Sequence, residues 1–235
     1  NGRSTETFRN EGHFDLIQKQ LRPGDFVVIQ FGHNDQKHPH LQAYNGYPEN
    51  LRRFIAEIRA KKALPILATP IARNVWTEQN GKLTYNDLLH DHAQACIALG
   101  KELNVPVLDL HQAAMDEIIR LGRDASKIYY HQGDWTHTND YGAVRAAGYA
   151  ADELRSLGEA FPDYLPLIQT VSASSEPWKP EAALLLEKPA RLAGVKDPNG
   201  TEEGTAAQDH QAEKDGGDAL ARLLAAVQSA CGQSV

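Results

Sequence analysis

One ten-residue stretch, Phe26–Asp35, constrains the fold of this chain more than any other part of its sequence. The stretch begins Phe-Val-Val-Ile-Gln-Phe, a β-branched and aromatic run that is typical of a strand buried on both faces. An Arg-Pro-Gly-Asp turn precedes this run, and a polar Gly-His-Asn-Asp turn follows it. Ligands bind just past the carboxyl ends of the strands in open α/β sheets. The end of this strand is therefore the first place where the sequence predicts chemistry.

Strands and helices alternate along the first 160 residues. Apolar runs predict strands at 25–31, 64–69 and 105–109. Apolar residues at helical spacing predict helices at 11–21, 48–62, 84–103, 111–121 and 139–157. The polar segments between them, at 36–47, 70–84 and 123–138, are expected to be loops. This alternation predicts an α/β fold with a parallel sheet and right-handed crossovers.

Three strands make a thin sheet for this class of fold. We therefore expect that the strands that should precede 25–31 are missing from this chain, which leaves an open edge and an uncovered apolar face. Both features promote aggregation, so we expect the isolated chain to be poorly soluble or oligomeric.

The character of the sequence changes near residue 165. We expect a packed domain over 1–165 and a linker or disordered tail over 166–235, because 196–218 is rich in Gly, Asp, Glu and Gln. A short amphipathic helix within the tail would be marginal by itself in water. Its apolar positions are Leu220, Leu223, Leu224 and Val227.

The composition narrows the range of partners. The formal charge is −7, with acidic and basic residues interspersed, which argues against nucleic acid or a membrane surface as the main partner. No apolar run approaches the roughly 20 residues that span a bilayer. Of the two cysteines, Cys96 lies in an apolar helical pattern and is expected to be a buried thiol. Beyond the expected self-association of the isolated chain, the oligomeric state is not predicted.

A second polar motif, Gly133–Ala143, opens the last predicted helix. Asp134 and His137 are three residues apart, so the carboxylate can hold the imidazole Nδ1–H and leave Nε2 as a general base. Asp134 or Asn139 is equally suited to cap the helix, and the two roles are compatible. We therefore predict a carboxylate–imidazole pair at this loop.

Other polar residues have simpler interpretations. The loop residues His33, Asp35, His38 and His40 have no spacing typical of a metal site, so we expect no metal there. We expect His90 and His92 to be structural or solvated, since residues two apart on a helix do not share a face. Ser4 is expected to be a turn or helix-cap hydroxyl.

In combination, these motifs resemble the SGNH (GDSL-type) hydrolases, and among them the rhamnogalacturonan acetylesterase-like branch. Gly32-His-Asn-Asp35 is similar to the third block of that family, and Asp134-Trp-Thr-His137 to the fifth. Gly2-Arg-Ser4 is similar to the second block, which supplies an oxyanion-hole glycine. The resemblance covers about residues 1–160 and implies a three-layer α/β/α, flavodoxin-like fold.

The resemblance also implies a reaction, the hydrolysis of acetyl esters on a pectic polysaccharide. His137 would be the base, oriented by Asp134, while the Asn34 amide and the Gly2 backbone N–H would stabilise the oxyanion. Such donors are typically worth about 2.7–4 kcal/mol each. No metal or organic cofactor is implied, and an extracellular or periplasmic location is favoured. The expected substrate-binding residues are His33, Arg73 and Trp76.

The nucleophile of that family is a serine in a Gly-Asp-Ser block upstream of the glycine block. Since this chain begins at the glycine block, we expect the serine and the first two strands to lie outside it, and the chain alone to be inactive. A non-catalytic carbohydrate-binding module or an inactive homologue is the alternative. A nucleotide-binding domain is disfavoured, because the sequence has no Gly-x-Gly-x-x-Gly or phosphate loop.

Overall fold

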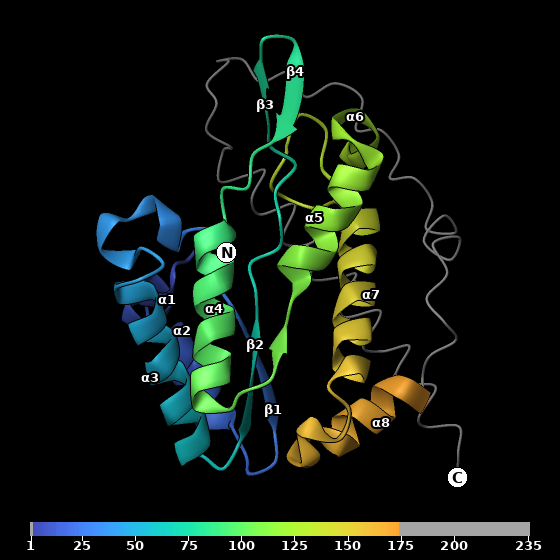
Figure 1. Ribbon diagram of the computed structural model, residues 1–235. Coiled ribbons are helices and arrows are strands. Elements are labelled where there is room, and N and C mark those ends of the chain that lie inside the picture. The colour runs from blue at the N-terminus through green and yellow to red at the C-terminus, as the bar shows by residue number, and fades with distance from the viewer. Residues whose placement is uncertain (1, 174–235) are drawn as a thin grey trace.

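The computed structural model describes residues 2–173, and these residues form an α/β fold around a parallel sheet (Figure 1). Its strand order is β1-β2-β5, and both strand pairs are parallel. The strands are β1 (Phe26–Gln30), β2 (Leu64–Ala68) and β5 (Val107–Leu108). The predicted fold class and the three predicted strand positions are therefore confirmed, with β5 shorter than expected.

Helices cover both faces of the sheet, which gives three layers (Figure 1). One layer consists of α1 (Thr5–Asn10), α2 (His13–Gln20), α3 (Gly46–Ala60) and α4 (His90–Leu103). The other consists of α5 (Leu110–Leu121), α7 (Asp140–Ser156) and α8 (Leu165–Ala173). Short helices lie in the connections: η1 (Asp35–Lys37), η2 (Pro39–Leu41), α6 (Arg123–Ser126), η3 (Lys127–Tyr129), η4 (Gly158–Ala160) and η5 (Pro162–Tyr164).

The central strand, β2, separates two hydrophobic cores. Leu67 belongs to the core beneath α3 and α4, whereas Ile66 and Ala68 belong to the core beneath α5 and α7. This division follows from the strand geometry, because successive side chains point to opposite faces of a sheet. All three side chains are almost completely buried. The strand that is buried on both faces is therefore β2.

The expectation that β1 is buried on both faces was wrong. Within the described residues β1 lies at the edge of the sheet, and the Val28 side chain is 55% exposed. A hollow of about 540 Å³ runs beside it, lined by β1 together with α1, α2 and α3. The β-branched sequence predicted the strand correctly, but composition alone cannot show on which side a strand has a partner.

A hairpin spans residues 76–85, most of it within the segment 70–84 that was expected to be a loop. Its antiparallel strands, β3 (Trp76–Gln79) and β4 (Lys82–Tyr85), project beyond the end of the sheet (Figure 1). Asn80 and Gly81 form the turn, with φ angles of 52° and 73°. Such positive angles are typical of a two-residue hairpin turn, and Asn-Gly is its strongest sequence signal. The Asn80-Gly81 pair therefore indicates a hairpin at this position.

Several predicted boundaries also need correction. Helix α1 was not predicted, because it is short and has few apolar positions; Ser4 caps it, as expected of that hydroxyl. Helix α4 begins six residues later than predicted, since β4 takes up the start of that segment. Leu88, within the predicted helix 84–103, and Ile119, within the predicted helix 111–121, are exposed. Cys96 is a buried free thiol, as predicted.

The packed chain extends past the expected boundary at residue 165. Helix α8 packs against the second core through Ile168, so 166–173 belong with the domain and not with a linker. The expectations for 174–235, including the helix around Leu220–Val227, lie outside the described residues. Between residues 2 and 173, no helix has both the length and the apolar character that a membrane crossing requires.

The open edge of β1 predicts self-association. Replacing Val28 with lysine should lower the aggregate fraction in light scattering, because a charge on an edge strand disfavours pairing with another chain. Ile128→Lys, at a side chain that is 48% exposed on η3, is the control and should have little effect. A monodisperse unmutated chain, or an equal effect of both substitutions, would contradict this prediction.

Candidate active site

Asp134 and His137 form the predicted carboxylate–imidazole pair. One carboxylate oxygen of Asp134 accepts a hydrogen bond from Nδ1 of His137 at 2.6 Å. The other accepts from the backbone N–H groups of Thr136, at 2.6 Å, and of His137, at 3.0 Å. With the proton on Nδ1, Nε2 is the nitrogen that can take a proton from a nucleophile. The geometry is that of a general base held by an orienting carboxylate.

These contacts also fix the charge of the carboxylate. Burial would raise the pKa of Asp134, but the hydrogen bonds from the His137 ring and from the two backbone N–H groups outweigh it and lower the pKa to about 2. The helix-capping role falls to Asn139, whose side chain accepts from the backbone N–H of Gly142 at 2.9 Å. Asn139 therefore caps helix α7, and Asp134 orients the His137 ring.

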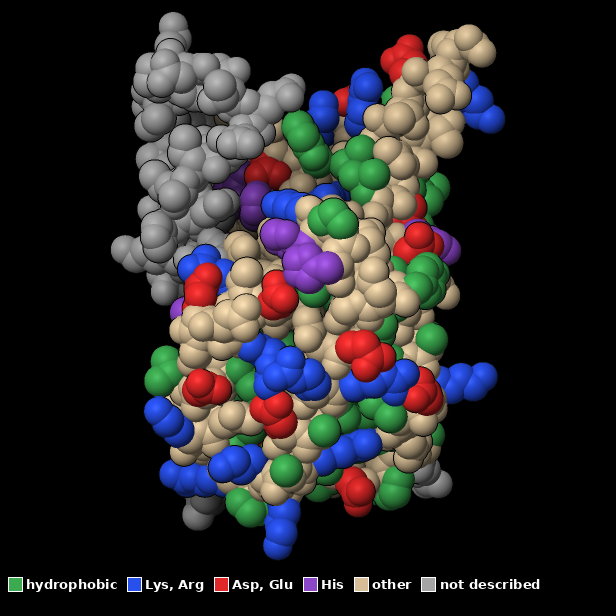
Figure 2. Space-filling model, turned by 90° about the vertical axis from the view of Figure 1, so that its left-hand side faces the viewer, with side chains coloured by type: hydrophobic (Ala, Val, Ile, Leu, Met, Phe, Trp, Pro, Cys, Tyr) green, Lys and Arg blue, Asp and Glu red, His purple; other side chains and the backbone are tan. Residues whose placement is uncertain are grey.

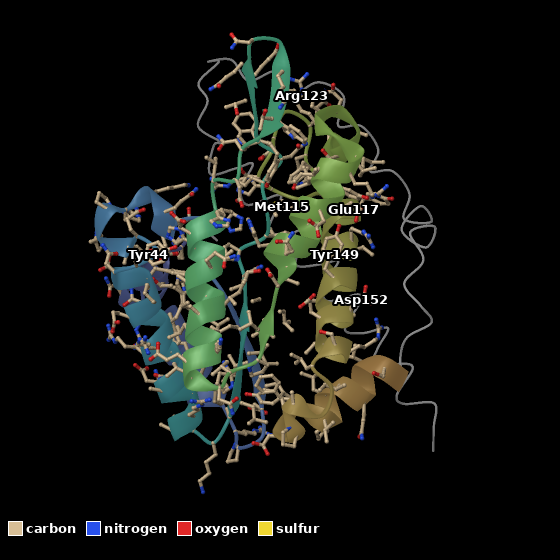
Figure 3. All side chains as sticks on the ribbon, viewed as in Figure 1. Tyr44, Met115, Glu117, Arg123, Tyr149 and Asp152 are labelled. Atoms are coloured by element: carbon tan, nitrogen blue, oxygen red, sulfur yellow. The ribbon has the colours of Figure 1, made fainter. Side chains whose placement is uncertain are left out.

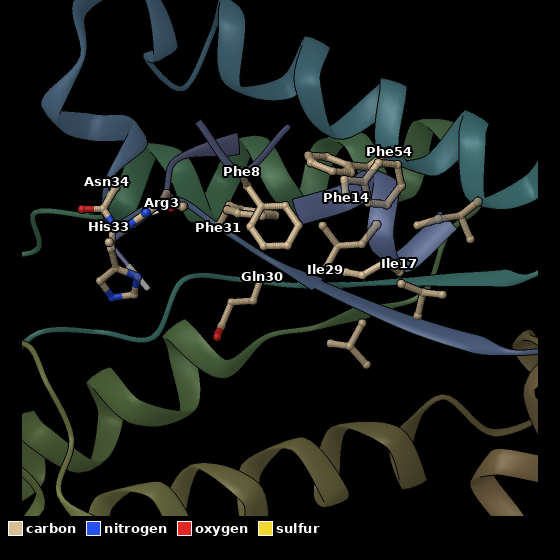
Figure 4. Close-up of a pocket in the computed structure, with 15 residues that line it drawn as sticks. Arg3, Phe8, Phe14, Ile17, Ile29, Gln30, Phe31, His33, Asn34 and Phe54 are labelled. Carbon is tan, nitrogen blue, oxygen red and sulfur yellow. Dashed lines mark hydrogen bonds between the residues drawn. The ribbon is translucent and has the colours of Figure 1, made fainter. Parts of the chain in front are cut away.

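The two oxyanion-hole candidates meet at the end of β1. Asn34 directs its side-chain amide toward the Arg3 carbonyl oxygen, 3.5 Å away, which places the amide next to the segment that contains Gly2. Both residues lie at the same end of the hollow beside β1, and Figure 4 shows Arg3, His33 and Asn34 together there. The structure therefore brings together residues 32 positions apart in the chain, as the resemblance implied.

A buried carboxylate holds this arrangement in place. Asp35 is fully buried and accepts hydrogen bonds from the backbone N–H and the hydroxyl of Thr5 and from the backbone N–H of Gly32, the last at 3.2 Å. Asn50 donates to the same Thr5 hydroxyl at 3.0 Å. Sequence reasoning treated Asp35 as a loop residue and missed this role. Its place in the turn after a strand, three residues after Gly32, was the available signal.

Arg73 contacts His33 in the turn that follows β1. Arg73 donates to the His33 carbonyl oxygen at 3.1 Å, and Nε2 of His33 lies 3.0 Å from the Ile71 carbonyl oxygen. Burial lowers the pKa of His33 to about 3, and the Arg73 cation adds to this shift. Burial also lowers the pKa of Arg73, while the Asp134 carboxylate opposes that shift. Arg73 is therefore within electrostatic range of both parts of the site.

Trp76 supports the site from outside. Its indole N–H donates to the Asn74 side-chain oxygen at 2.6 Å, and its ring packs edge-on against Tyr85, with centroids 5.5 Å apart. Asn74 in turn donates its backbone N–H to the Trp135 carbonyl oxygen at 2.8 Å. These contacts pack the Trp76 indole against the chain, and its expected role in substrate binding stays a prediction. Trp135, inside the dyad motif and 51% exposed, is the aromatic side chain next to the dyad.

A buried network anchors the chain just before the dyad loop. The Glu117 carboxylate accepts hydrogen bonds from Tyr129, Tyr149 and Arg145, which ties η3 and α7 to α5; Glu117 and Tyr149 lie close together in Figure 3. Burial would raise the pKa of Glu117, but these hydrogen bonds, that of Arg145 first, lower it below its usual value. An isolated pairing of Tyr130 with Thr138 then closes the loop.

Two further histidines, His40 and His92, have partners outside the dyad. On the face shown in Figure 2, histidine side chains gather in the upper half, beside acidic and basic groups, and mixed charges cover the lower half. His40 pairs with Glu6 at 2.9 Å, and His92 is buried with Nε2 3.2 Å from the Leu41 carbonyl oxygen. Among residues 2–173, no three His, Cys, Asp or Glu side chains are grouped so that they could hold a metal ion.

The sequence of this chain matches a known protein family. The sequence profile of the GDSL-like lipase/acylhydrolase family matches residues 1–145. The chain belongs to this family. The family expected from the sequence is thereby confirmed.

Named relatives of this GDSL-family chain include carbohydrate esterases. It is 33% identical over 177 residues to the rhamnogalacturonan acetylesterase RhgT of Bacillus subtilis, covering 70% of this chain and 75% of that protein. It is 28% identical over 188 residues to the rhamnogalacturonan acetylesterase of Emericella nidulans, covering 70% and 74%.

A crystal structure of YxiM from Bacillus subtilis shares the fold. The TM-score is 0.58 at 29% sequence identity, and the match covers 67% of this chain. The GDSL-family chain spans 44% of the YxiM chain. The likeness supports the α/β assignment of the described residues.

The Asp35 contacts predict a stability cost. In Asp35→Asn, one acceptor oxygen becomes an NH₂ group that faces an N–H or O–H donor, so the free energy of unfolding should fall by about 1–3 kcal/mol. Urea unfolding measures this change, with the exposed Asp163→Asn as the matched control. Equal stability of the two variants would contradict a structural role for Asp35.

The dyad predicts a titration. Since folding lowers the pKa of Asp134 to about 2, its contribution to stability is complete above its unfolded pKa, near 3.9, and is lost as the pH falls toward 2. His137→Ala removes the strongest of the hydrogen bonds and should raise this pKa, as followed by carboxyl ¹³C NMR. An unchanged titration in the variant would show that the pair does not form.

Proposed function

We propose that this GDSL-family chain is the esterase part of an enzyme that removes acetyl groups from a pectic polysaccharide. The observation that carries the proposal is the Asp134–His137 pair, with the bond between Oδ2 and Nδ1 at 2.6 Å. The names of the relatives RhgT and the Emericella nidulans enzyme support the substrate class. Acetylated oligo- or polysaccharide is thus the proposed partner.

The proposed mechanism has two half-reactions. A serine oxygen attacks the acetyl carbonyl carbon while Nε2 of His137 takes the serine proton, and Asp134 stabilises the imidazolium that forms. The Asn34 amide and the Gly2 backbone N–H donate to the tetrahedral oxyanion. His137 then gives its proton to the departing sugar oxygen, which leaves an acetyl-serine. Water hydrolyses this ester in the second half-reaction, with His137 again as the base.

The serine is proposed to lie outside the 235 residues, on their N-terminal side. Ser4 and Ser126 have structural roles: Ser4 caps α1, and the Ser126 hydroxyl donates to the Gly122 carbonyl oxygen at 2.8 Å. The hollow along β1 reaches Asn34, and β1 is the edge strand of the described sheet, so a further strand could pair with it there. A strand in this position would end beside the oxyanion donors.

The test uses a longer polypeptide that includes the residues before Asn1. It should hydrolyse p-nitrophenyl acetate, and His137→Ala should lower kcat/KM by roughly 10²–10⁴-fold, because the general base is lost. His13→Ala is a matched control, since both imidazoles are 44% exposed and both contact a carboxylate. Full activity in His137→Ala would refute the mechanism, whereas binding of acetylated pectin without hydrolysis would favour the carbohydrate-binding alternative.

A further inference from the structure

We propose that Nδ1 of His33 accepts a hydrogen bond from a free hydroxyl of the substrate sugar, next to the carbon that carries the acetyl ester. This inference rests on the proposed function and names a feature that the substrate must have. It makes His33 a specificity-determining residue, distinct in role from the base His137.

The first observation is the tautomer of the ring. Nε2 of His33 lies 3.0 Å from the carbonyl oxygen of Ile71, and a carbonyl oxygen can only accept a hydrogen bond. Nε2 must therefore carry the proton. In a neutral imidazole the other nitrogen, Nδ1, then has a lone pair and acts as an acceptor.

The second observation is that this acceptor is unused by the described chain. Across residues 2–173, no N–H or O–H group donates to Nδ1 of His33. The atom is also not one of the buried side-chain nitrogen and oxygen atoms that lack a hydrogen-bond partner, so it is exposed to solvent. His33 also lines the hollow at the end formed by Gly2, Arg3 and Asn34 (Figure 4). Nδ1 is thus an accessible acceptor at the site.

The charges around the ring keep it neutral. Burial disfavours the imidazolium most, and the Arg73 cation and the His137 and His111 rings disfavour it further, while the hydrogen bond to the Ile71 carbonyl oxygen favours it. Together they hold the pKa of His33 near 3. The ring is therefore neutral, with Nδ1 as an acceptor, at every pH well above 3.

The backbone around the ring is fixed. Arg73 holds the His33 carbonyl oxygen at 3.1 Å. Gly32 has a φ of 135°, and a Cβ there would lie 2.9 Å from Cγ of Pro70, so the chain passes too close to Pro70 for any other residue. An acceptor held in this way does not lose side-chain freedom when the substrate binds.

The position of the acceptor determines which part of the substrate it meets. His33 is adjacent to Asn34, whose amide is the proposed oxyanion donor, so Nδ1 lies near the groups around the acetyl carbon. An acetyl group offers only a methyl group and oxygen acceptors, and neither can donate a hydrogen bond. The donor must then come from the alcohol side, where a sugar has a hydroxyl next to the esterified one.

The kinetic test compares two acetylated methyl glycosides in the active longer polypeptide, one with the neighbouring hydroxyl and one with that hydroxyl removed. The unmutated enzyme should prefer the hydroxylated ester by roughly 10–100-fold in kcat/KM. The bound deoxy ester covers Nδ1 of His33 without donating a hydrogen bond to it, which leaves the acceptor unpaired. His33→Phe should abolish the preference, while His33→Gln, with an acceptor oxygen and an N–H donor, should retain much of it. His40→Phe, at an exposed histidine, is the control and should leave it unchanged.

Equal losses on both esters in His33→Phe, with the preference intact, would show a merely structural role and overturn the inference. A second readout does not depend on turnover: the imidazole ¹⁵N shift of His33 Nδ1 in the 235-residue chain should move on adding the hydroxylated glycoside but not the deoxy one. If no ester is hydrolysed, the proposed function fails, and the ¹⁵N shift alone then tests whether His33 binds the sugar hydroxyl. No shift would then overturn the inference, and a shift specific to the hydroxylated sugar would support it.

Discussion

The hydrogen bonds of the buried Asp35 carboxylate fix the arrangement of the chain at the end of β1. The carboxylate joins the turn after β1 to the start of α1 through Thr5 and Gly32. Because a fully buried carboxylate must satisfy its hydrogen bonds within the protein, the two segments have one favourable arrangement. That arrangement places Gly2 beside Asn34, so the proposed oxyanion donors depend on a residue that would not itself touch the substrate.

His137, the proposed base, is held by a separate set of contacts. Asn74 fixes the Trp135 backbone, and the Glu117 network fixes the chain that enters the loop. Asp134 then orients the imidazole through a short hydrogen bond. Catalytic groups held by packed neighbours need little reorganisation during the reaction, and this is the form of preorganisation that the structure supports.

The sequence predicted the parts of this structure that local patterns determine, and failed where distant contacts decide. The three strands and the Asp134–His137 pair follow from apolar runs and from a three-residue spacing. The edge position of β1 depends on how the strands are ordered, and the buried contacts of Asp35 depend on Thr5, 30 residues earlier in the sequence. The β3–β4 hairpin is different, since its Asn-Gly turn was a usable local signal.

We propose one esterase site that acts with a serine N-terminal to this chain and is formed by Asp134, His137, Asn34 and Gly2. The most direct measurement is labelling of the longer polypeptide with a fluorophosphonate, followed by peptide mapping of the modified serine. One labelled serine before Asn1 is expected, together with loss of labelling in His137→Ala. Labelling of a serine within the 235 residues, or labelling that does not depend on His137, would contradict it.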